Sequence, residues 1–504
     1  MNSRYLDFLE SKIALEFKGV KIGDFLYSLH FIKGQMNDSQ SFLIAGSTLF
    51  AIKYCAPSSV SQPIKRFNIN NILNLCQEYY LSDPILFDQD LRHEFLDQNP
   101  IFMILRTMSN QFNFSSGCIQ ESARSLFLYS EIPNQLKSPS GFNFEEKFKL
   151  LTKVSVLDFV SVGFLVFVAA SQSHFQINPS ILLKSMKKRG INLSRDTFIC
   201  AFDQISADQA KFMSLYQKRK NQDQRFAMYD FNPLITYPVI KPCQGKNFLK
   251  DDQQFFYAPI PGLIASRITS GIFYQMFNEY KTNFSDYFGL VFEKYVGLIL
   301  QRSLFQGTLF SESEIREVYS SKEGMAPDWA FVYEETVILF ECKIARFSKE
   351  AQAIANVEAV NKSLLQIEKG LRQLASFISA CRAKHPGLEN FHHCNRFIPI
   401  LISLEPLYLI NTSLFRKHID NILASKSVIG LDWQILAVEH LESLQPHLEA
   451  GYSLVQFLDN LKKVSFNNLL DSIANETGKT FADSFLYKKQ KKIYQHIGLT
   501  ETDV

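Results

Sequence analysis

Two short apolar runs that meet at an acidic pair constrain this chain more than any other feature. Residues 327–333 and 336–344 are rich in aromatic and β-branched side chains, and only Glu334-Glu335 separates them. This pattern predicts a β-hairpin with a two-residue loop. In that register Asp328 lies opposite Glu341, so both side chains point to the same face of the sheet. Lys343 shares this face because side chains alternate along a strand.

Two carboxylates and one ammonium group at one end of a hairpin predict a cation site. Neighbouring carboxylates repel each other unless a proton or a cation joins them. Oxygen ligands suit Mg²⁺ or Mn²⁺, so we expect Asp328 and Glu341 to be the metal ligands. Such an ion polarises a phosphodiester oxygen and acidifies a bound water. Lys343 would orient that water or offset charge on the phosphate, and the chemistry expected is phosphodiester hydrolysis.

The Glu-x-Lys pattern is not specific by itself. It occurs five times, beginning at residues 10, 16, 145, 279 and 341. Only Glu341 follows an apolar β run with Pro-Asp at hairpin distance. A simpler alternative makes Asp328 a turn residue at the strand entry and makes Glu341 and Lys343 an ion pair on an edge strand.

Pro327-Asp328, a gap of twelve residues and Glu341-x-Lys343 together resemble the motif of the PD-(D/E)XK nuclease superfamily. The resemblance covers residues 283–440. There the order helix, hairpin, helix, strand, helix, strand predicts a mixed sheet flanked by helices. The fold it implies is an α/β restriction-endonuclease-like core. It also implies an acidic residue on the helix before the hairpin and a glutamine on the helix after it. The implied catalytic set, with Mg²⁺ or Mn²⁺ as cofactor, is Asp328, Glu341, Lys343, Glu293 and Gln373.

The rest of the chain divides into regions that differ in composition and in predicted secondary structure. Residues 1–228 predict a large, mainly helical N-terminal body, in which residues 41–54 are a strand-like exception. Residues 229–282 predict a Pro- and aromatic-rich connector, of which residues 229–261 are expected to be ordered coil or short edge strands. Residues 441–504, after the α/β segment, predict a helical extension.

The positive charge of the chain is concentrated in its first half. The whole chain has 53 Lys and Arg against 50 Asp and Glu, and residues 1–284 hold 30 and 24 of them, a net +6. A polyanion is therefore expected to approach the first half. Lys218-Arg219-Lys220, followed by Arg225 and several aromatic residues, is the expected nucleic-acid-binding segment. The alternative for these three residues is a solvated helix face.

Cysteine usage and apolar patterning indicate a cytoplasmic protein. The eight cysteines form no Cys-x-x-Cys pair, which is typical of a reducing compartment. The first 30 residues lack the pattern of a secretory signal. An apolar stretch at residues 154–170 has an uncharged part that is too short to span a membrane, so we expect a buried helix and no membrane partner.

These features together predict a metal-dependent nuclease that acts on DNA. The large N-terminal region and the lack of helicase or methylase motifs are similar to effectors of bacterial anti-phage defence. In that hypothesis the N-terminal region senses a trigger such as a phage-encoded protein. One alternative is a ribonuclease, including a tRNA-cleaving one, with the same site. Another is a non-catalytic module that binds nucleic acid or protein. The sequence predicts no particular subunit number.

Overall fold

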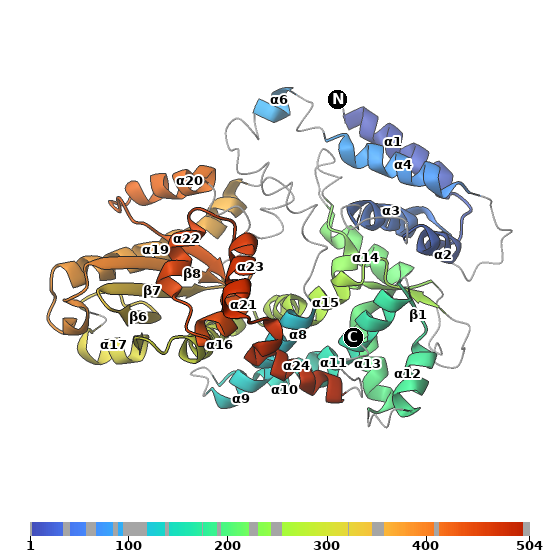
Figure 1. Cartoon of the computed structure of the whole chain (residues 1–504). Coiled ribbons are helices and arrows are strands. Elements are labelled where there is room, and N and C mark those ends of the chain that lie inside the picture. The colour runs from blue at the N-terminus through green and yellow to red at the C-terminus, as the bar shows by residue number, and fades with distance from the viewer. Residues whose placement is uncertain are drawn as a thin grey trace.

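The structure is a computed structural model of the 504-residue chain. About 67% of the residues that the structure describes are helical, and two small mixed sheets are flanked by helices (Figure 1). The residues that the structure describes are 3–33, 41–56, 67–83, 89–93, 118–136, 141–173, 175–188, 193–220, 230–242, 255–320, 322–344, 357–407 and 413–496.

The first helices pack on a small four-stranded sheet. The helices are α1 (Ser3–Phe17), α2 (Ile22–Lys33), α3 (Ser41–Tyr54) and α4 (Ile69–Leu81). The sheet has the order β1-β4-β3-β2, formed by β1 (Gln176–Ile177), β2 (Ser206–Asp208), β3 (Val239–Lys241) and β4 (Phe256–Tyr257). Ala207, Ile240 and Tyr257 from three of these strands join the helices in one apolar core. Two of the strands therefore come from the Pro- and aromatic-rich segment 229–282.

Helix α3 corrects the strand-like interpretation of residues 41–54. Every residue from Leu43 to Ile52 is buried, so the segment is buried on all sides, and most of its side chains are apolar. A continuous apolar run has no period that separates a helix from a strand. Its fourteen residues exceed the usual length of a strand, and surrounding helices cover it on every side.

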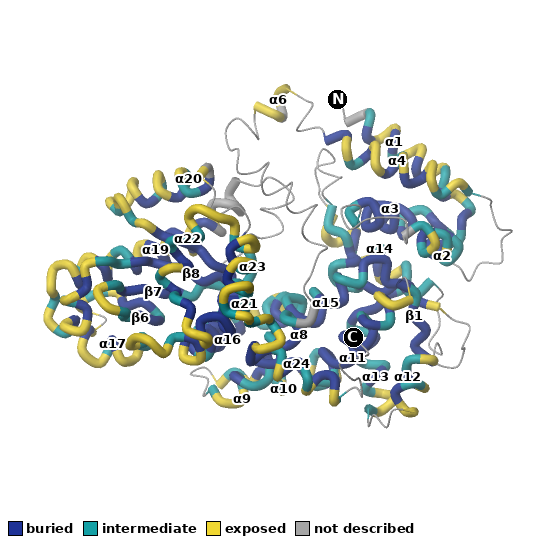
Figure 2. Tube along the Cα trace, in the orientation of Figure 1, coloured by how far each residue is buried: buried dark blue, intermediate teal, exposed yellow. Residues whose placement is uncertain are grey.

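A second group of helices forms a larger core. It comprises α8 (Cys118–Leu126), η3 (Phe127–Glu131), α9 (Ile132–Gln135), α10 (Phe144–Thr152), α11 (Val156–Gln172), α12 (Pro179–Lys188), α13 (Arg195–Ile205) and α15 (Gly262–Ile268). Helix α14 (Gln209–Arg219) instead packs into the first core through Phe212. Helix α11 is the expected apolar helix, and most of its residues are buried in this core, which confirms that prediction (Figure 2). Within the described ranges no single helix has the length and apolarity to cross a membrane. One bent pair, α10 with α11, passes that test jointly.

The five-stranded sheet has the order β5-β6-β7-β8-β9. Its strands are β5 (Thr308–Ser311), β6 (Trp329–Tyr333), β7 (Thr336–Lys343), β8 (Arg396–Ser403) and β9 (Gln434–Ala437). Strands β5, β6 and β7 are antiparallel to one another, whereas β7, β8 and β9 are parallel. Helix α16 (Ser270–Ser303) shares the core on one face with Trp329 and Phe340. Helices α19 (Val357–Arg382) and α20 (Ser413–Ala424) cover the other face.

The predicted hairpin register is confirmed. Tyr333 pairs with Thr336, Phe331 with Ile338, and Trp329 with Phe340. Strand β5 was not predicted, because four residues with little alternation give no clear strand signal. Its presence makes β6 an inner strand, and β7 lies in the middle of the sheet.

The C-terminal helices return to the N-terminal half. They are α21 (Val438–Glu449), α22 (Leu454–Leu461), α23 (Phe466–Thr477) and α24 (Phe485–His496), so the predicted helical extension is present. The rings of Phe485 and Phe127 lie 5.2 Å apart, and the rings of Tyr494 and Phe164 lie 5.6 Å apart. Helix α24 therefore packs against η3 and α11, so the C-terminal helix and these N-terminal helices share one hydrophobic core.

Candidate active site

Asp328 stands directly before β6 and is held by two neighbouring segments. Its carbonyl oxygen accepts a hydrogen bond from the N–H of Glu312 at 2.8 Å. Its Oδ2 accepts a hydrogen bond from the N–H of Cys342 at 2.6 Å. Burial raises the pKa of the Asp328 carboxyl, and the hydrogen bond from Cys342 offsets part of that rise. The side chain is thus fixed beside the end of β7, where the hairpin register predicted it.

Glu312 is a site residue that sequence reasoning missed. It opens helix α17 (Glu312–Val318), directly after β5. Ser311 and Glu314 form a capping box, in which Glu314 Oε2 accepts a hydrogen bond from the Ser311 N–H at 2.7 Å. The capping box turns the chain into a helix at this point and leaves Glu312 beside Asp328. The Ser-x-x-Glu pattern was readable in the sequence and would have placed an acidic residue at a helix start.

Glu293 reaches the same place from helix α16, as the resemblance implied. The indole Nε1 of Trp329 donates a hydrogen bond to the Glu293 carbonyl oxygen at 3.2 Å. A Cβ atom at Gly297, one turn later, would overlap the Trp329 ring. The glycine therefore lets α16 approach β6 closely. Burial, followed by the nearby charge of Asp328, raises the pKa of Glu293 to about 7.

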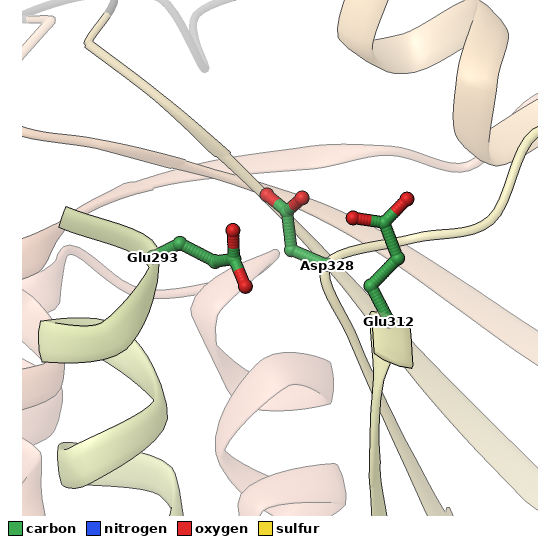
Figure 3. A group of neighbouring side chains, drawn as sticks. All are labelled: Glu293, Glu312 and Asp328. Atoms are coloured by element: carbon green, nitrogen blue, oxygen red, sulfur yellow. The ribbon is translucent and has the colours of Figure 1, made fainter. Parts of the chain in front are cut away.

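Glu293, Glu312 and Asp328 converge on one point (Figure 3). Each offers a carboxylate oxygen, and these oxygens lie within 4.8 Å of one another. Three carboxylates at this separation repel one another, and a cation relieves that repulsion. A set made only of carboxylate oxygens suits hard divalent cations such as Mg²⁺ and Mn²⁺. Among the described residues this triad is the group that meets the geometry of a metal site, and it contains one of the two predicted ligands.

Glu341, the other predicted ligand, is the most deeply buried acid of the cluster, with 1% of its surface exposed. Its Oε1 is ion-paired with the Nζ of Lys343, and its Oε2 is buried without a hydrogen-bond partner. Burial and the charge of Asp328 raise the pKa of Glu341 to about 8, although Lys343 acts in the opposite direction. A buried carboxylate oxygen without a partner is costly, and a bound cation or an ordered water would satisfy it.

Lys343 is held between the carboxylates and helix α19. Burial lowers its pKa, but the charge of Glu341 and its hydrogen bond outweigh burial, so the pKa is raised and the ammonium form is favoured. A Cβ atom at Gly370 of α19 would lie 3.3 Å from Lys343 Cε and 3.3 Å from Glu341 Cγ. The helix therefore passes directly over this pair.

The edge-strand alternative is wrong in one respect. The ion pair between Glu341 and Lys343 exists, but β7 lies between β6 and β8 and is not an edge strand. An ion pair with no further role has little reason to be buried in a central strand, because burial of charge costs more than it returns unless every polar atom is satisfied. Here one Glu341 oxygen is unsatisfied.

Gln373, expected in the catalytic set, contacts the backbone that leads to Asp328. Its Nε2 donates a hydrogen bond to the Ala326 carbonyl oxygen at 2.7 Å. This bond ties α19 to the chain two residues before Asp328. Gln373 therefore positions the acidic residue through the backbone.

Lys218, Arg219 and Lys220 are not brought to the carboxylates. They lie at the end of α14, in the N-terminal half, apart from the five-stranded sheet (Figure 1). All three are exposed, and the Arg219 guanidinium lies 4.8 Å from the centre of the Phe231 ring. Their surroundings fit the solvated helix face that was the alternative interpretation.

The site thus combines four carboxylates and one ammonium group at the end of β7, with Gly370 of α19 packed over Glu341 and Lys343. Scans against protein-family models, curated proteins and solved structures found no significant match to this chain.

Proposed function

We propose that this protein is a metal-dependent nuclease built on a restriction-endonuclease-like core. The observation that carries the proposal is the convergence of Glu293, Glu312 and Asp328 within 4.8 Å. The buried pair of Glu341 and Lys343 lies on the adjoining strand. This combination matches the needs of phosphodiester hydrolysis, in which charge on a phosphate must be neutralised and a water activated.

Each residue has a distinct task in the proposed reaction. Glu293, Glu312 and Asp328 would hold Mg²⁺ or Mn²⁺, and Glu341 would supply its unpaired Oε2 to the ion or to one of its waters. A bound divalent ion supplies Lewis-acid polarisation of the phosphodiester and an acidified water. Lys343 keeps its proton, because the carboxylates raise its pKa. Its charge would therefore face the negative charge that develops on the phosphate.

The substrate test compares plasmid DNA, genomic DNA and total tRNA, each with Mg²⁺, with Mn²⁺ and with EDTA. We expect metal-dependent cleavage of DNA by the wild type and loss of cleavage in Asp328→Asn and Lys343→Ala. Asp459→Asn, which changes a surface ion pair with Arg396, is the matched control and should cleave normally. Cleavage confined to tRNA would assign the ribonuclease alternative. Binding without turnover under every condition would assign the non-catalytic one.

A role in anti-phage defence is part of the proposal and rests on the large N-terminal region with its own core. An always-active nuclease harms its own cell, so this region would restrain the site until a phage-encoded component engages it. Such a trigger needs only a difference in affinity between the two states. The test challenges cells that express wild type or Lys343→Ala with a broad phage panel. Equal plaque counts would reject the defence role without affecting the nuclease proposal.

A further inference from the structure

One side of helix α19 carries four polar residues, the last of which contacts the backbone that leads to Asp328. Lys362, Gln366, Lys369 and Gln373 are spaced by four, three and four residues, so they lie along one side of the helix. The first three are exposed. Gln373, the fourth, is hydrogen-bonded to the Ala326 carbonyl oxygen, two residues before Asp328. We call these four residues the α19 flank.

The position of Gly370 fixes the α19 flank relative to the reacting groups. Gly370 lies directly over Glu341 and Lys343, and Lys369 is its neighbour in the chain. Strands β7 and β8 are parallel, so the crossover helix α19 runs back along the sheet in the opposite direction. The turns before Gly370 therefore extend beyond the end of β7. With a rise of about 1.5 Å per residue, Lys362 lies roughly 10 Å farther along the helix than Lys369.

The α19 flank has two charged residues, Lys362 and Lys369. The neighbouring Glu368 and Arg372 pair with each other at 3.2 Å. Within the described part of the chain, Lys362 and Lys369 take part in no ion pair. The two ammonium groups are therefore available to an anionic partner.

The site itself needs such a flank. Four carboxylates are accompanied by Lys343 and by Arg316, which pairs with Glu312 at 3.2 Å, so acidic charge exceeds basic charge at the site and opposes a polyanion when no cation is bound. Lys362 and Lys369 add positive charge on the neighbouring helix, and the amides of Gln366 and Gln373 are polar without adding negative charge. Phosphate groups are commonly bound by lysine side chains of this kind.

We propose that the α19 flank binds the phosphodiester backbone of the nucleic-acid substrate and guides it to Asp328 and Lys343. The inference rests on the proposed nuclease function. It replaces Lys218, Arg219 and Lys220 as the substrate-binding segment. Because the contacts are to phosphates, the flank binds DNA and RNA strands alike and reads no base sequence.

The test measures binding separately from cleavage. Fluorescence anisotropy follows a labelled 20-nucleotide DNA and an RNA of the same sequence, at several salt concentrations with Mg²⁺, in an Asp328→Asn background. Added to this background, Lys362→Gln with Lys369→Gln removes two phosphate contacts. Each lost contact lowers the slope of log Kd against log salt by about 0.7 for a single strand, so the double variant should lose about 1.4.

Two matched variants serve as controls. Lys463→Gln removes an exposed lysine between α22 and α23 and should leave the slope unchanged. Lys218→Gln with Lys220→Gln removes the same charge from α14 and should also leave it unchanged. Lys362→Arg with Lys369→Arg retains both charges and should keep the parent slope.

Several results would overturn the inference. An unchanged slope in the α19 double variant, or a larger loss in the α14 variant, would exclude the α19 flank as the substrate path. A loss confined to DNA or to RNA would contradict contacts made only to the backbone. Failure of the nuclease proposal is seen independently, as the absence of metal-dependent cleavage by the wild type, and the slope comparison still decides the α19 inference in that case.

Discussion

Four acidic side chains at the end of one sheet compete for protons and cations. This competition determines how single substitutions change the stability and the metal affinity of the protein. Burial raises the pKa of Asp328, Glu293 and Glu341, so each ionised carboxylate is costly when no cation is bound. Glu312 differs from these three because Arg316 lies 3.2 Å from its carboxylate. A divalent cation should therefore stabilise the folded chain by binding the ionised cluster.

Glu312→Gln tests the ligand that the sequence did not reveal. We expect the rise in melting temperature caused by Mn²⁺ to shrink, with at least about a tenfold loss in apparent metal affinity, since losing even an outer-shell partner costs that much. In EDTA the variant should melt close to the wild-type temperature, because removal of a repulsive charge offsets the loss of the partly exposed ion pair with Arg316. Thermal melts across a Mn²⁺ titration measure both effects. A metal response equal to that of the wild type would exclude Glu312 as a ligand.

Glu293→Gln tests the pH dependence of the metal-free protein. The folded-state pKa of Glu293 is raised to about 7 from an ordinary value of 4.5, so the folded state binds this proton more tightly than the unfolded state. The resulting stabilisation is fully present below about pH 4.5 and is lost as the pH rises through 7. The variant should lack this contribution, which is at most about 1.4 kcal/mol per pH unit. Denaturant midpoints in EDTA at four pH values give the slope, and equal slopes would contradict the assignment.

At the scale of elements, the contact between α16 and β6 decides whether Glu293 reaches Asp328. Trp329 holds the helix through a hydrogen bond to the Glu293 carbonyl and through its ring against Gly297. Helix α16 can lie this close to β6 because Gly297 has no side chain to contact the Trp329 ring. An added methyl group would push the helix away from the strand and move one carboxylate out of the cluster.

Gly297→Ala and Gly289→Ala form a matched pair on the same helix. At Gly297 the new methyl group overlaps the Trp329 ring, and overpacking should cost about 1–3 kcal/mol and reduce cleavage. At Gly289 nothing lies within 4 Å, so the substitution should stabilise the helix by about 0.4–1 kcal/mol and leave cleavage unchanged. Denaturant melts and cleavage rates of both variants test this. Similar behaviour of the two would refute the close-approach argument.

At the scale of the whole molecule, a buried polar network joins three distant parts of the chain at helix α16. Glu442 of α21 is fully buried and pairs with the Arg124 guanidinium of α8, with atom separations of 2.6 and 2.7 Å. Tyr295 Oη of α16 and Gln120 Nε2 of α8 donate to the same carboxylate at 2.6 and 2.8 Å. Tyr295 is two residues from Glu293, so the N-terminal half and the C-terminal helices together hold the helix of the site.

Glu442→Ala should be the most damaging of the changes described. It leaves the Arg124 guanidinium buried without its counter-charge, and breaking a buried pair costs about 3–5 kcal/mol. Asp459→Asn breaks an exposed pair with Arg396 and should cost at most about 1 kcal/mol. Urea midpoints of the two variants are compared with that of the wild type. A loss at Glu442 no larger than that at Asp459 would show that the network does not hold the three parts together.

The sequence by itself determined the local features of this protein. The hairpin register follows from the two-residue loop and from the alternation of side chains along both strands. The sequence therefore placed Asp328, Glu341 and Lys343 on one face of the sheet without knowledge of the rest of the fold. Apart from β5 and α17, which were not predicted, the order of helices and strands from residue 283 to 440 followed from local periodicity. Both depend on neighbours within about ten to twenty residues.

Only the tertiary structure decided which distant residues join them. Glu312 enters the site because β5 pairs with β6, and a four-residue strand gives too little pattern to predict that pairing. Residues 41–54 became a helix because packing on all sides, not periodicity, selects the conformation of a uniformly apolar segment. Lys218 to Lys220 lie on α14, away from the carboxylates. The α19 flank lies near the carboxylates because the crossover from β7 to β8 carries α19 back over Glu341 and Lys343. Such long-range placement depends on which surfaces are buried together, and a local pattern does not encode it.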